Sequence, residues 1–172
     1  MVQVLIEREA IARRVLELAR EIERDTPGGG PVHLVAVLKG AFVFLADLIR
    51  AFEIPVTCDF MAVSSYQDGQ VSSGVVRLTK DLDQDLAGRD VVLVEDIVDS
   101  GASLAYLQQL LRARSPRSFR TVCLLDKHTR RQTPVAIDYV GFAVDDRFVV
   151  GYGLDLGERY RELPFIGVVV AR

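Results

Sequence analysis

The stretch that decides the fold is VVLVEDIVDSGAS, residues 91–103. It begins with four apolar residues, a run typical of a strand buried on both faces of a parallel sheet. The acids Glu95 and Asp96 end this run, and after two more apolar residues comes a turn rich in hydroxyl groups. Leucines at helical spacing follow, at positions 104, 107, 110 and 111. We therefore predict a strand, a short loop and a helix within a parallel α/β sheet.

The turn has the chemistry of a phosphate site. The first turn of a helix leaves backbone N–H groups unpaired and carries about half a positive charge. Gly101 permits a positive φ and a close backbone approach, while Ser100 and Ser103 add hydroxyl donors. Carboxylates repel phosphate, so those beside the turn are expected to bind a metal, hold sugar hydroxyls or accept a proton; they belong to Glu95, Asp96 and Asp99. The pattern predicts a ligand with a phosphate, hydroxyls and Mg²⁺.

A simpler alternative is a buried strand and a helix capped by Ser100 or Ser103. The neighbouring acids argue against it, because carboxylates are rarely buried without partners. The whole pattern, with two acids, two apolar residues and Asp-Ser-Gly-x-Ser, resembles the ribose-5-phosphate signature of type I phosphoribosyltransferases. The resemblance implies their α/β fold, with a central, mostly parallel sheet flanked by helices, a small hood and a mobile loop.

Length and composition favour a soluble globular protein. The chain has 172 residues, so we expect one phosphoribosyltransferase domain over residues 1–172. Its hydrophobic content is 49% and its charged content 26%, both ordinary values. A net charge of −3 speaks against nucleic-acid and membrane-surface binding.

The distribution of apolar and cysteine residues indicates a cytoplasmic location. Apolar runs are too short to span a bilayer, and Glu7 interrupts the first of them too early for a secretory signal. Cys58 and Cys123 are far apart and lack metal-site spacing, so we expect both to be reduced. No membrane partner is expected.

The first third of the chain contains a second strand–turn–helix unit. A short strand over Val2–Ile6 and an amphipathic helix from Glu7 to about Glu23 come first. The unit itself is a strand over Val32–Leu38 and a helix that runs to about Ala51. We expect His33, near the start of this strand, to be a turn-edge residue without a role.

The turn of this unit contains Lys39 and Gly40. An exposed lysine at a strand end is the simple interpretation of Lys39. By resemblance, residues 38–41 form the pyrophosphate loop, which in the family commonly holds a non-proline cis peptide before the lysine.

A polar, glycine-bearing stretch over residues 64–74 follows a strand predicted at Pro55–Val63. Its composition suits a mobile surface loop, and residues 75–79 return from it as a strand. In phosphoribosyltransferases that act on 6-oxopurines, a loop carrying Ser-Tyr at this place closes over the substrate. Ser65 and Tyr66 match that pair.

A basic run follows the strand predicted at Ser118–Leu125. Ligands bind at the carboxyl ends of parallel strands, although a basic surface loop is an equally good interpretation of this run alone. By resemblance, Lys127 hydrogen-bonds the 6-oxo group of a purine, and Arg131 helps to hold pyrophosphate.

The segment from Phe148 to Asp155 is close to another family signature. Phe148 is either a core aromatic or a stacking platform for the purine, and the resemblance favours stacking. Backbone near Val149 and Asp155 would contact the purine 2-position, and Asp155 would bind Mg²⁺ through oxygen. Arg161 matches the second pyrophosphate-binding arginine, and the chain ends in a strand.

The resemblance implies a purine-salvage enzyme. It would transfer 5-phosphoribosyl from phosphoribosyl pyrophosphate to hypoxanthine or guanine, giving IMP or GMP and pyrophosphate, with Mg²⁺ as cofactor. Asp99 would accept the proton of purine N7, and Glu95 and Asp96 would hold the ribose hydroxyls and the metal. The 5′-phosphate would lie on Ser100, Gly101, Ala102 and Ser103, with Ala102 offering backbone only. Family members form homodimers or homotetramers.

Two alternatives remain open from the sequence. The chain could be a nucleotide-binding sensor, although a sensor needs no Asp99 base, or a phosphoribosyltransferase for another base. Glu95 and Asp96 are also neighbours on one strand, whose side chains ideally point to opposite faces. If both reach the ribose, we expect the backbone to bend there.

Overall fold

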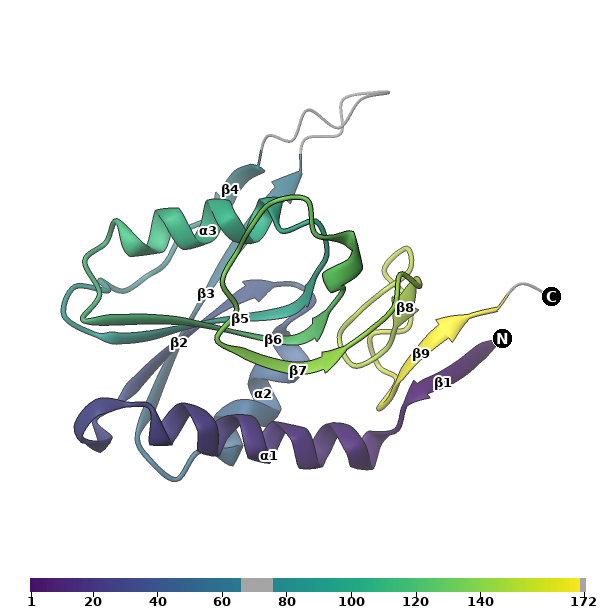
Figure 1. Ribbon diagram of the computed structural model, residues 1–172, viewed down its shortest axis with the longest axis horizontal. Helices are drawn as coiled ribbons and strands as arrows, with labels where there is room; N and C mark the ends of the chain where they lie inside the picture. The colour runs from purple at the N-terminus through teal and green to yellow at the C-terminus, as the bar shows by residue number, and fades with distance from the viewer. Residues whose placement is uncertain (66–75, 171–172) are drawn as a thin grey trace.

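The computed structural model describes residues 1–65 and 76–170 (Figure 1). Helices and strands alternate along most of the chain, as the sequence predicted for an α/β fold. The elements in order are β1 (Val2–Ile6), α1 (Arg8–Arg24), η1 (Pro27–Gly29), β2 (Val32–Leu38), α2 (Phe42–Ala51), β3 (Val56–Ser65), β4 (Val76–Lys80), β5 (Asp90–Val98), α3 (Ala102–Arg112), β6 (Ser118–Asp126), η2 (His128–Arg130), β7 (Tyr139–Ala143), β8 (Val149–Val150) and β9 (Ile166–Val169).

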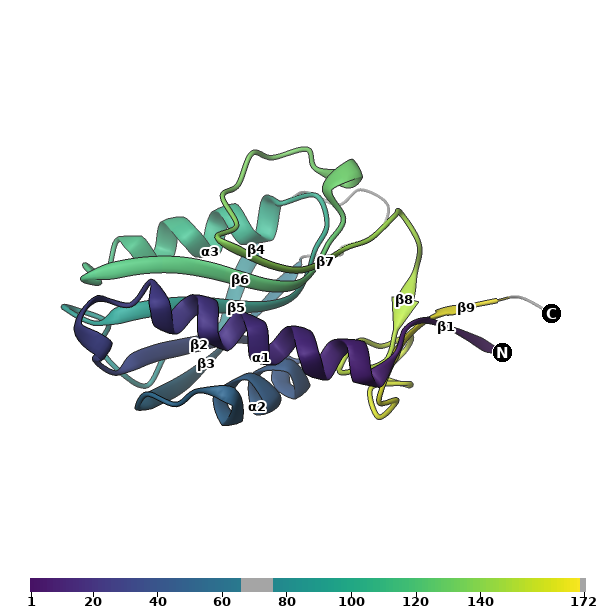
Figure 2. The same ribbon diagram turned by 60° about the horizontal axis from the view of Figure 1, so that its bottom comes forward.

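The main sheet has six strands in the order β4-β3-β2-β5-β6-β7. All neighbouring pairs are parallel except β3 and β4. Helices α1 and α2 cover one face and α3 covers the other (Figure 2). The predicted mostly parallel sheet with flanking helices is therefore confirmed.

Burial on both faces explains the unbroken apolar runs in the central strands. On one face, Leu34 and Val92 belong to the core that includes the buried stripe of α1 and α2. On the other, Val35 and Leu93 pack with the leucines of α3. Because alternate residues of a strand point to opposite faces, both faces need apolar side chains.

The hood is a three-stranded antiparallel sheet in the order β1-β9-β8. The first and last strands of the chain pair with each other, so both ends of the chain lie together (Figure 1). This small sheet anchors the segment between β8 and β9 at one end of the main sheet (Figure 2).

One local expectation was wrong. His33 is buried inside β2, 2% exposed, with its Nδ1 2.8 Å from Thr57 Oγ1. The sequence pattern missed this because a polar residue at a strand start resembles a turn. Among the described residues, no helix is long and apolar enough to cross a membrane.

Candidate active site

The site lies where β2 and β5 separate. These strands pair from Val32–Asp90 to Ala36–Val94, whereas β2 stays paired with β3 as far as Leu38. The chain leaves β2 toward β3 and leaves β5 toward β6, so their carboxyl ends form a topological switch point. Such points open crevices for ligands in α/β sheets.

The turn after β5 forms a backbone cradle at the start of α3. Gly101 is the N-cap of α3, with φ +89°, in place of either serine. The Ser100 carbonyl accepts hydrogen bonds from the N–H groups of Gln132 and Thr133, both at 3.0 Å. A Cβ on Gly101 would lie 2.6 Å from the Thr133 carbonyl oxygen, so only glycine fits. The segment after β6 therefore braces the cradle.

A cavity of about 180 Å³ lies over this cradle. Ala102 and Ser103 are exposed, and they belong to the first turn of α3. The Ala102 N–H donates to Ser100 Oγ at 3.4 Å, and the amides of a first helical turn are suited to bind an anion. Polar residues supply part of the cavity wall: Glu95, Asp99, Ser100, Gly101 and Ser103.

A second cavity, of about 490 Å³, adjoins the first across Val63, which lines both. It is built from five parts of the chain: the loop after β2, the strands β3 and β4, the end of β5 and the turns after β8. The Leu38–Lys39 peptide at its edge is cis, as the resemblance implied. The charged and glycine residues of its wall are Lys39, Gly40, Asp96, Asp155, Glu158 and Arg161.

Glu95 and Asp96 line different cavities. Val94 and Ile97, three residues apart, pack into the same core, so the alternation of side chains along β5 is interrupted between them, and this supports the expected bend. Burial raises the pKa of Glu95 well above its usual range, with a further contribution from Asp96. Burial also raises the pKa of Asp96 to about 6. A Cβ on Gly40 would lie 1.6 Å from Asp96 Oδ2, so this glycine makes room for the carboxylate.

The carboxylate of Asp99 lies among cations. Its Oδ1 accepts a hydrogen bond from Arg130 Nε at 3.2 Å, and its Oδ2 is 4.0 Å from Lys127 Nζ. Lys127 is buried, with its backbone N–H bonded to the Val98 carbonyl at 3.0 Å. Arg130 also pairs with Asp146 at 3.1 Å, which ties Asp99 to the loop that carries Phe148.

Phe148 is 57% exposed, so its interpretation as a core aromatic was wrong. Its neighbour Val149 is buried in β8, which pairs with β9 in the hood. This pairing holds the backbone next to Phe148 in place. An exposed phenylalanine on an anchored strand end is free to stack on a ligand.

The remaining predicted site residues are Arg131, which follows β6, and the pair Ser65 and Tyr66. Arg131 pairs with Asp126, and its Nε donates to the Asp99 carbonyl at 3.3 Å, so it supports the cradle. It does not line the larger cavity. Ser65 is the last residue of β3, and Tyr66 lies outside the described residues. Closure of a loop at this pair stays a prediction.

Comparison with known proteins identifies the family. Residues 3–156 match the family described as a phosphoribosyl transferase domain. The chain belongs to this phosphoribosyl transferase family. It is 45% identical to hypoxanthine phosphoribosyltransferase of Salmonella typhimurium, over 98% of this chain and 96% of the relative. It is 48% identical to hypoxanthine-guanine phosphoribosyltransferase of Bacillus subtilis, over 97% and 92%.

Solved structures agree with the sequence relatives. A hypoxanthine-guanine phosphoribosyltransferase from Bacillus anthracis, crystallised with a HEPES molecule in its active site, superposes with a TM-score of 0.92. The two chains are 45% identical, and the match covers 98% of each. This phosphoribosyl transferase family therefore accounts for nearly the whole length of the chain.

Two residues of the candidate site were not predicted from the sequence. Arg130 contacts the Asp99 carboxylate, and Glu158 bridges Lys39 and Arg161. Arg130 had a signal, its place in the basic run after β6. Glu158 had none, because an acid in a polar turn is an ordinary surface residue.

The carboxylates of the site suit Mg²⁺ only together with ligand oxygens. No three His, Cys, Asp or Glu side chains gather into a metal-binding group within residues 1–65 and 76–170. Asp96 and Asp155 line the larger cavity, while Glu95 lines the smaller one. Mg²⁺ commonly uses one or two carboxylates and completes its octahedron with phosphate oxygens and water. The carboxylates of Asp96, Asp155 and Glu95 fit this way of binding Mg²⁺.

Proposed function

We propose that the chain is a hypoxanthine-guanine phosphoribosyltransferase of purine salvage. It transfers 5-phosphoribosyl from phosphoribosyl pyrophosphate to hypoxanthine or guanine, and gives IMP or GMP and pyrophosphate. The observation that carries this proposal is the junction of an anion cradle with a cation-lined cavity, with Asp99 at the cradle. Full-length relatives with these names support it.

The cradle is the proposed 5′-phosphate site. The first amides of α3 and the hydroxyls of Ser100 and Ser103 donate to phosphate oxygens. Gly101 and Ala102 contribute backbone only. Glu95 and Asp96 flank the junction of the cavities, where the ribose hydroxyls would lie and donate hydrogen bonds to them.

The larger cavity is the proposed pyrophosphate site. Negative charge grows on the leaving group as its bond to the ribose breaks, and cations already in place stabilise it. Lys39 and Arg161 supply those cations, and Gly40 leaves space beside them. Arg131 is further from this cavity wall, and its part in binding pyrophosphate stays a prediction.

The purine is proposed to lie on Phe148, with Lys127 donating a hydrogen bond to the 6-oxo group. Purine N9 forms the bond to ribose C1′ as the bond from C1′ to pyrophosphate breaks. Asp99 Oδ accepts the N7 proton, which leaves the product neutral at that ring. The adjacent Val149 and Asp155 would contact the 2-position through backbone.

Asp96 and Asp155, with Glu95 nearby, are the residues proposed to hold Mg²⁺. When bound, Mg²⁺ supplies positive charge to the pyrophosphate oxygens. Ser65 and Tyr66 are proposed to lie at the start of a loop that closes over the site and excludes water. We also propose that residues 1–172 act as one domain in the cytoplasm.

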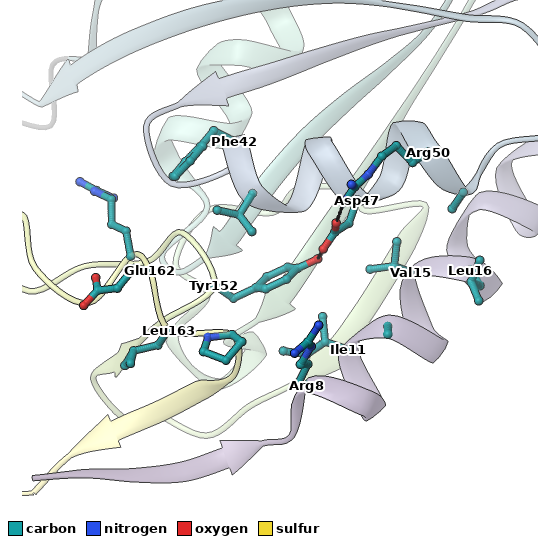
Figure 3. A pocket seen from close by; sticks show the side chains of 15 residues that line it. Arg8, Ile11, Val15, Leu16, Phe42, Asp47, Arg50, Tyr152, Glu162 and Leu163 are labelled. Carbon is teal, nitrogen blue, oxygen red and sulfur yellow. Dashed lines mark hydrogen bonds and ion pairs between the residues drawn. The ribbon is translucent and has the colours of Figure 1, made fainter.

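Self-association as a homodimer or homotetramer is the proposed assembly. A groove of about 960 Å³ lies between α1, α2 and the segment before β9 (Figure 3). Exposed Phe42 and Leu16 line it, and Tyr152 crosses it to donate a 2.6 Å hydrogen bond to Asp47. A Trypanosoma cruzi relative, 42% identical, was studied for the role of its C-terminal region in oligomeric state and activity. Light scattering after gel filtration tests this assembly.

A steady-state assay tests the function. Hypoxanthine, guanine, xanthine, adenine and uracil are offered separately with phosphoribosyl pyrophosphate and Mg²⁺. Nucleotide from hypoxanthine and guanine, and none from adenine or uracil, is the expected result. Tight IMP binding without turnover of any base would overturn the enzyme proposal in favour of a nucleotide sensor.

A further inference from the structure

One carboxylate joins the two cations of the larger cavity. Glu158 Oε2 is 3.0 Å from Lys39 Nζ, and Glu158 Oε1 is 3.3 Å from Arg161 Nη2. Lys39 and Glu158 are separated by 119 residues in sequence. The two oxygens of Glu158 thus make contacts that two oxygens of one phosphoryl group would make.

The backbone of the turn holds Glu158 in this position. Its φ is +66°, a left-handed conformation that non-glycine residues seldom adopt. Its N–H donates to Asp155 Oδ2 at 2.8 Å, and Leu156 and Arg159 form an isolated β-bridge around it. The carboxylate is therefore directed at the cavity by a closed turn.

The ion pairs of Glu158 contribute little to the stability of the fold, so stability does not explain why they are there. The side chains of Lys39 and Glu158 are 66% and 64% exposed, and ion pairs so exposed contribute little. Arg161 has other partners besides Glu158: its Nη2 is 3.0 Å from Asp155 Oδ1, and its Nη1 donates to the Gly153 carbonyl at 2.7 Å. Its buried Nε has no partner among the described residues. A ligand with more oxygens and more charge would satisfy both cations better than Glu158 does.

We propose that Glu158 occupies the pyrophosphate site in the ligand-free protein and is displaced when pyrophosphate binds. This inference rests on the proposed function. Displacement costs the two ion pairs of Glu158, so Glu158 lowers pyrophosphate affinity and speeds release of that product. Singly charged anions gain too little at Lys39 and Arg161 to displace it, which favours ligands with a diphosphate.

Calorimetric titration of the full chain with pyrophosphate in the presence of Mg²⁺ tests the inference, and IMP is left out because IMP and pyrophosphate together are the substrates of the reverse reaction. We expect Glu158→Gln to bind pyrophosphate about fivefold more tightly than the wild type, since it lacks two exposed ion pairs. Glu162→Gln is the matched control, because it removes the same charge four residues along the chain. Its affinity is expected to change less than about twofold.

The direction of the change in pyrophosphate affinity shows whether Glu158 competes with the ligand or supports the site. Loss of a merely structural residue would weaken pyrophosphate binding, so equal or weaker binding by Glu158→Gln would overturn the inference alone. Absence of pyrophosphate binding in the wild type as well would overturn the proposed function together with the inference.

Acylation of Lys39, followed by mass spectrometry, gives a second measurement without turnover. In the absence of ligand, Lys39 is expected to react faster in Glu158→Gln than in the wild type, because its ion pair is gone. Saturating pyrophosphate is expected to slow the reaction in both. Equal rates in the ligand-free proteins would contradict the bridge itself.

Discussion

The two cavities of the site are built in different ways. The cradle comes from one contiguous turn, Asp99–Ser103, and its binding groups are backbone amides at the start of α3. The larger cavity is assembled from side chains of distant segments, with Lys39 and Glu158 119 residues apart. Hydrogen bonds to the Ser100 carbonyl from the loop after η2 fix the first, whereas exposed ion pairs hold the second.

The cradle is therefore the rigid part of the site, and the larger cavity is the part that can adapt to its ligand. A backbone cradle braced by two 3.0 Å hydrogen bonds is in place before a ligand arrives, which suits the 5′-phosphate site proposed for it. Side chains joined by exposed ion pairs can exchange those partners for ligand oxygens at small cost. The cradle thus suits a group retained through the reaction, and the larger cavity suits a group that must leave.

The largest expected effect is on chemistry at the cradle. Asp99→Asn removes the base but keeps a side-chain oxygen for Arg130, so turnover should fall by about a thousandfold. IMP affinity should change less than about threefold, since the cradle amides are untouched. Steady-state kinetics and calorimetry measure the two effects. Equal losses in turnover and IMP affinity would show that Asp99 serves binding instead of proton transfer.

Glycine substitutions should affect the two cavities differently. Gly101→Ala meets the Thr133 carbonyl at 2.6 Å with φ +89°, so we expect a loss of about 2–3 kcal/mol in unfolding free energy. Gly40→Ala meets only the Asp96 side chain, so it should impair pyrophosphate binding with a smaller loss of stability. Gly30→Ala, with no contact closer than 3.7 Å, is the control. Urea denaturation and pyrophosphate titration measure both; equal stability losses at positions 101 and 40 would contradict the contrast.

Removing the exposed ring beside the cradle should have a moderate effect. Phe148→Ala should raise the KM for hypoxanthine about tenfold, since stacking on an aromatic ring is worth about 1–3 kcal/mol. The KM for phosphoribosyl pyrophosphate should stay nearly constant, because that ligand occupies the two cavities. Phe148→Tyr should restore the base KM. An unchanged base KM in the alanine variant would remove Phe148 from the site.

The smallest effect is expected at the opposite edge of the sheet. Burial, and then the charge of Arg89, lower the pKa of His33, so the unfolded chain binds a proton that the folded chain resists. Stability is therefore full above about pH 6.5 and declines as the pH falls below it. His33→Phe should remove this component from a series of urea denaturations between pH 8 and 5. Identical pH dependence in the variant and the wild type would rule out His33 as its source.

The sequence predicted those features best that depend on residues close together in the chain. The strands β2 and β5 and the helices α1 to α3 were placed to within a few residues, because apolar periodicity is local. Phe148 and Lys127 were singled out by pattern, and their exposure and burial became known only with the fold. The bend expected at Glu95 agrees with the packing of Val94 and Ile97 into one core, which became known only with the fold.

The sequence by itself determined the strand–turn–helix units, the phosphate cradle and the family, since each depends on residues close together in the chain. The tertiary structure alone decided that Glu158 bridges Lys39 and Arg161, that Arg131 supports the cradle, and that His33 is buried. These outcomes depend on which segments meet after the sheet has formed. An exposed acid or a strand-end histidine carries no local pattern that says what will pack against it.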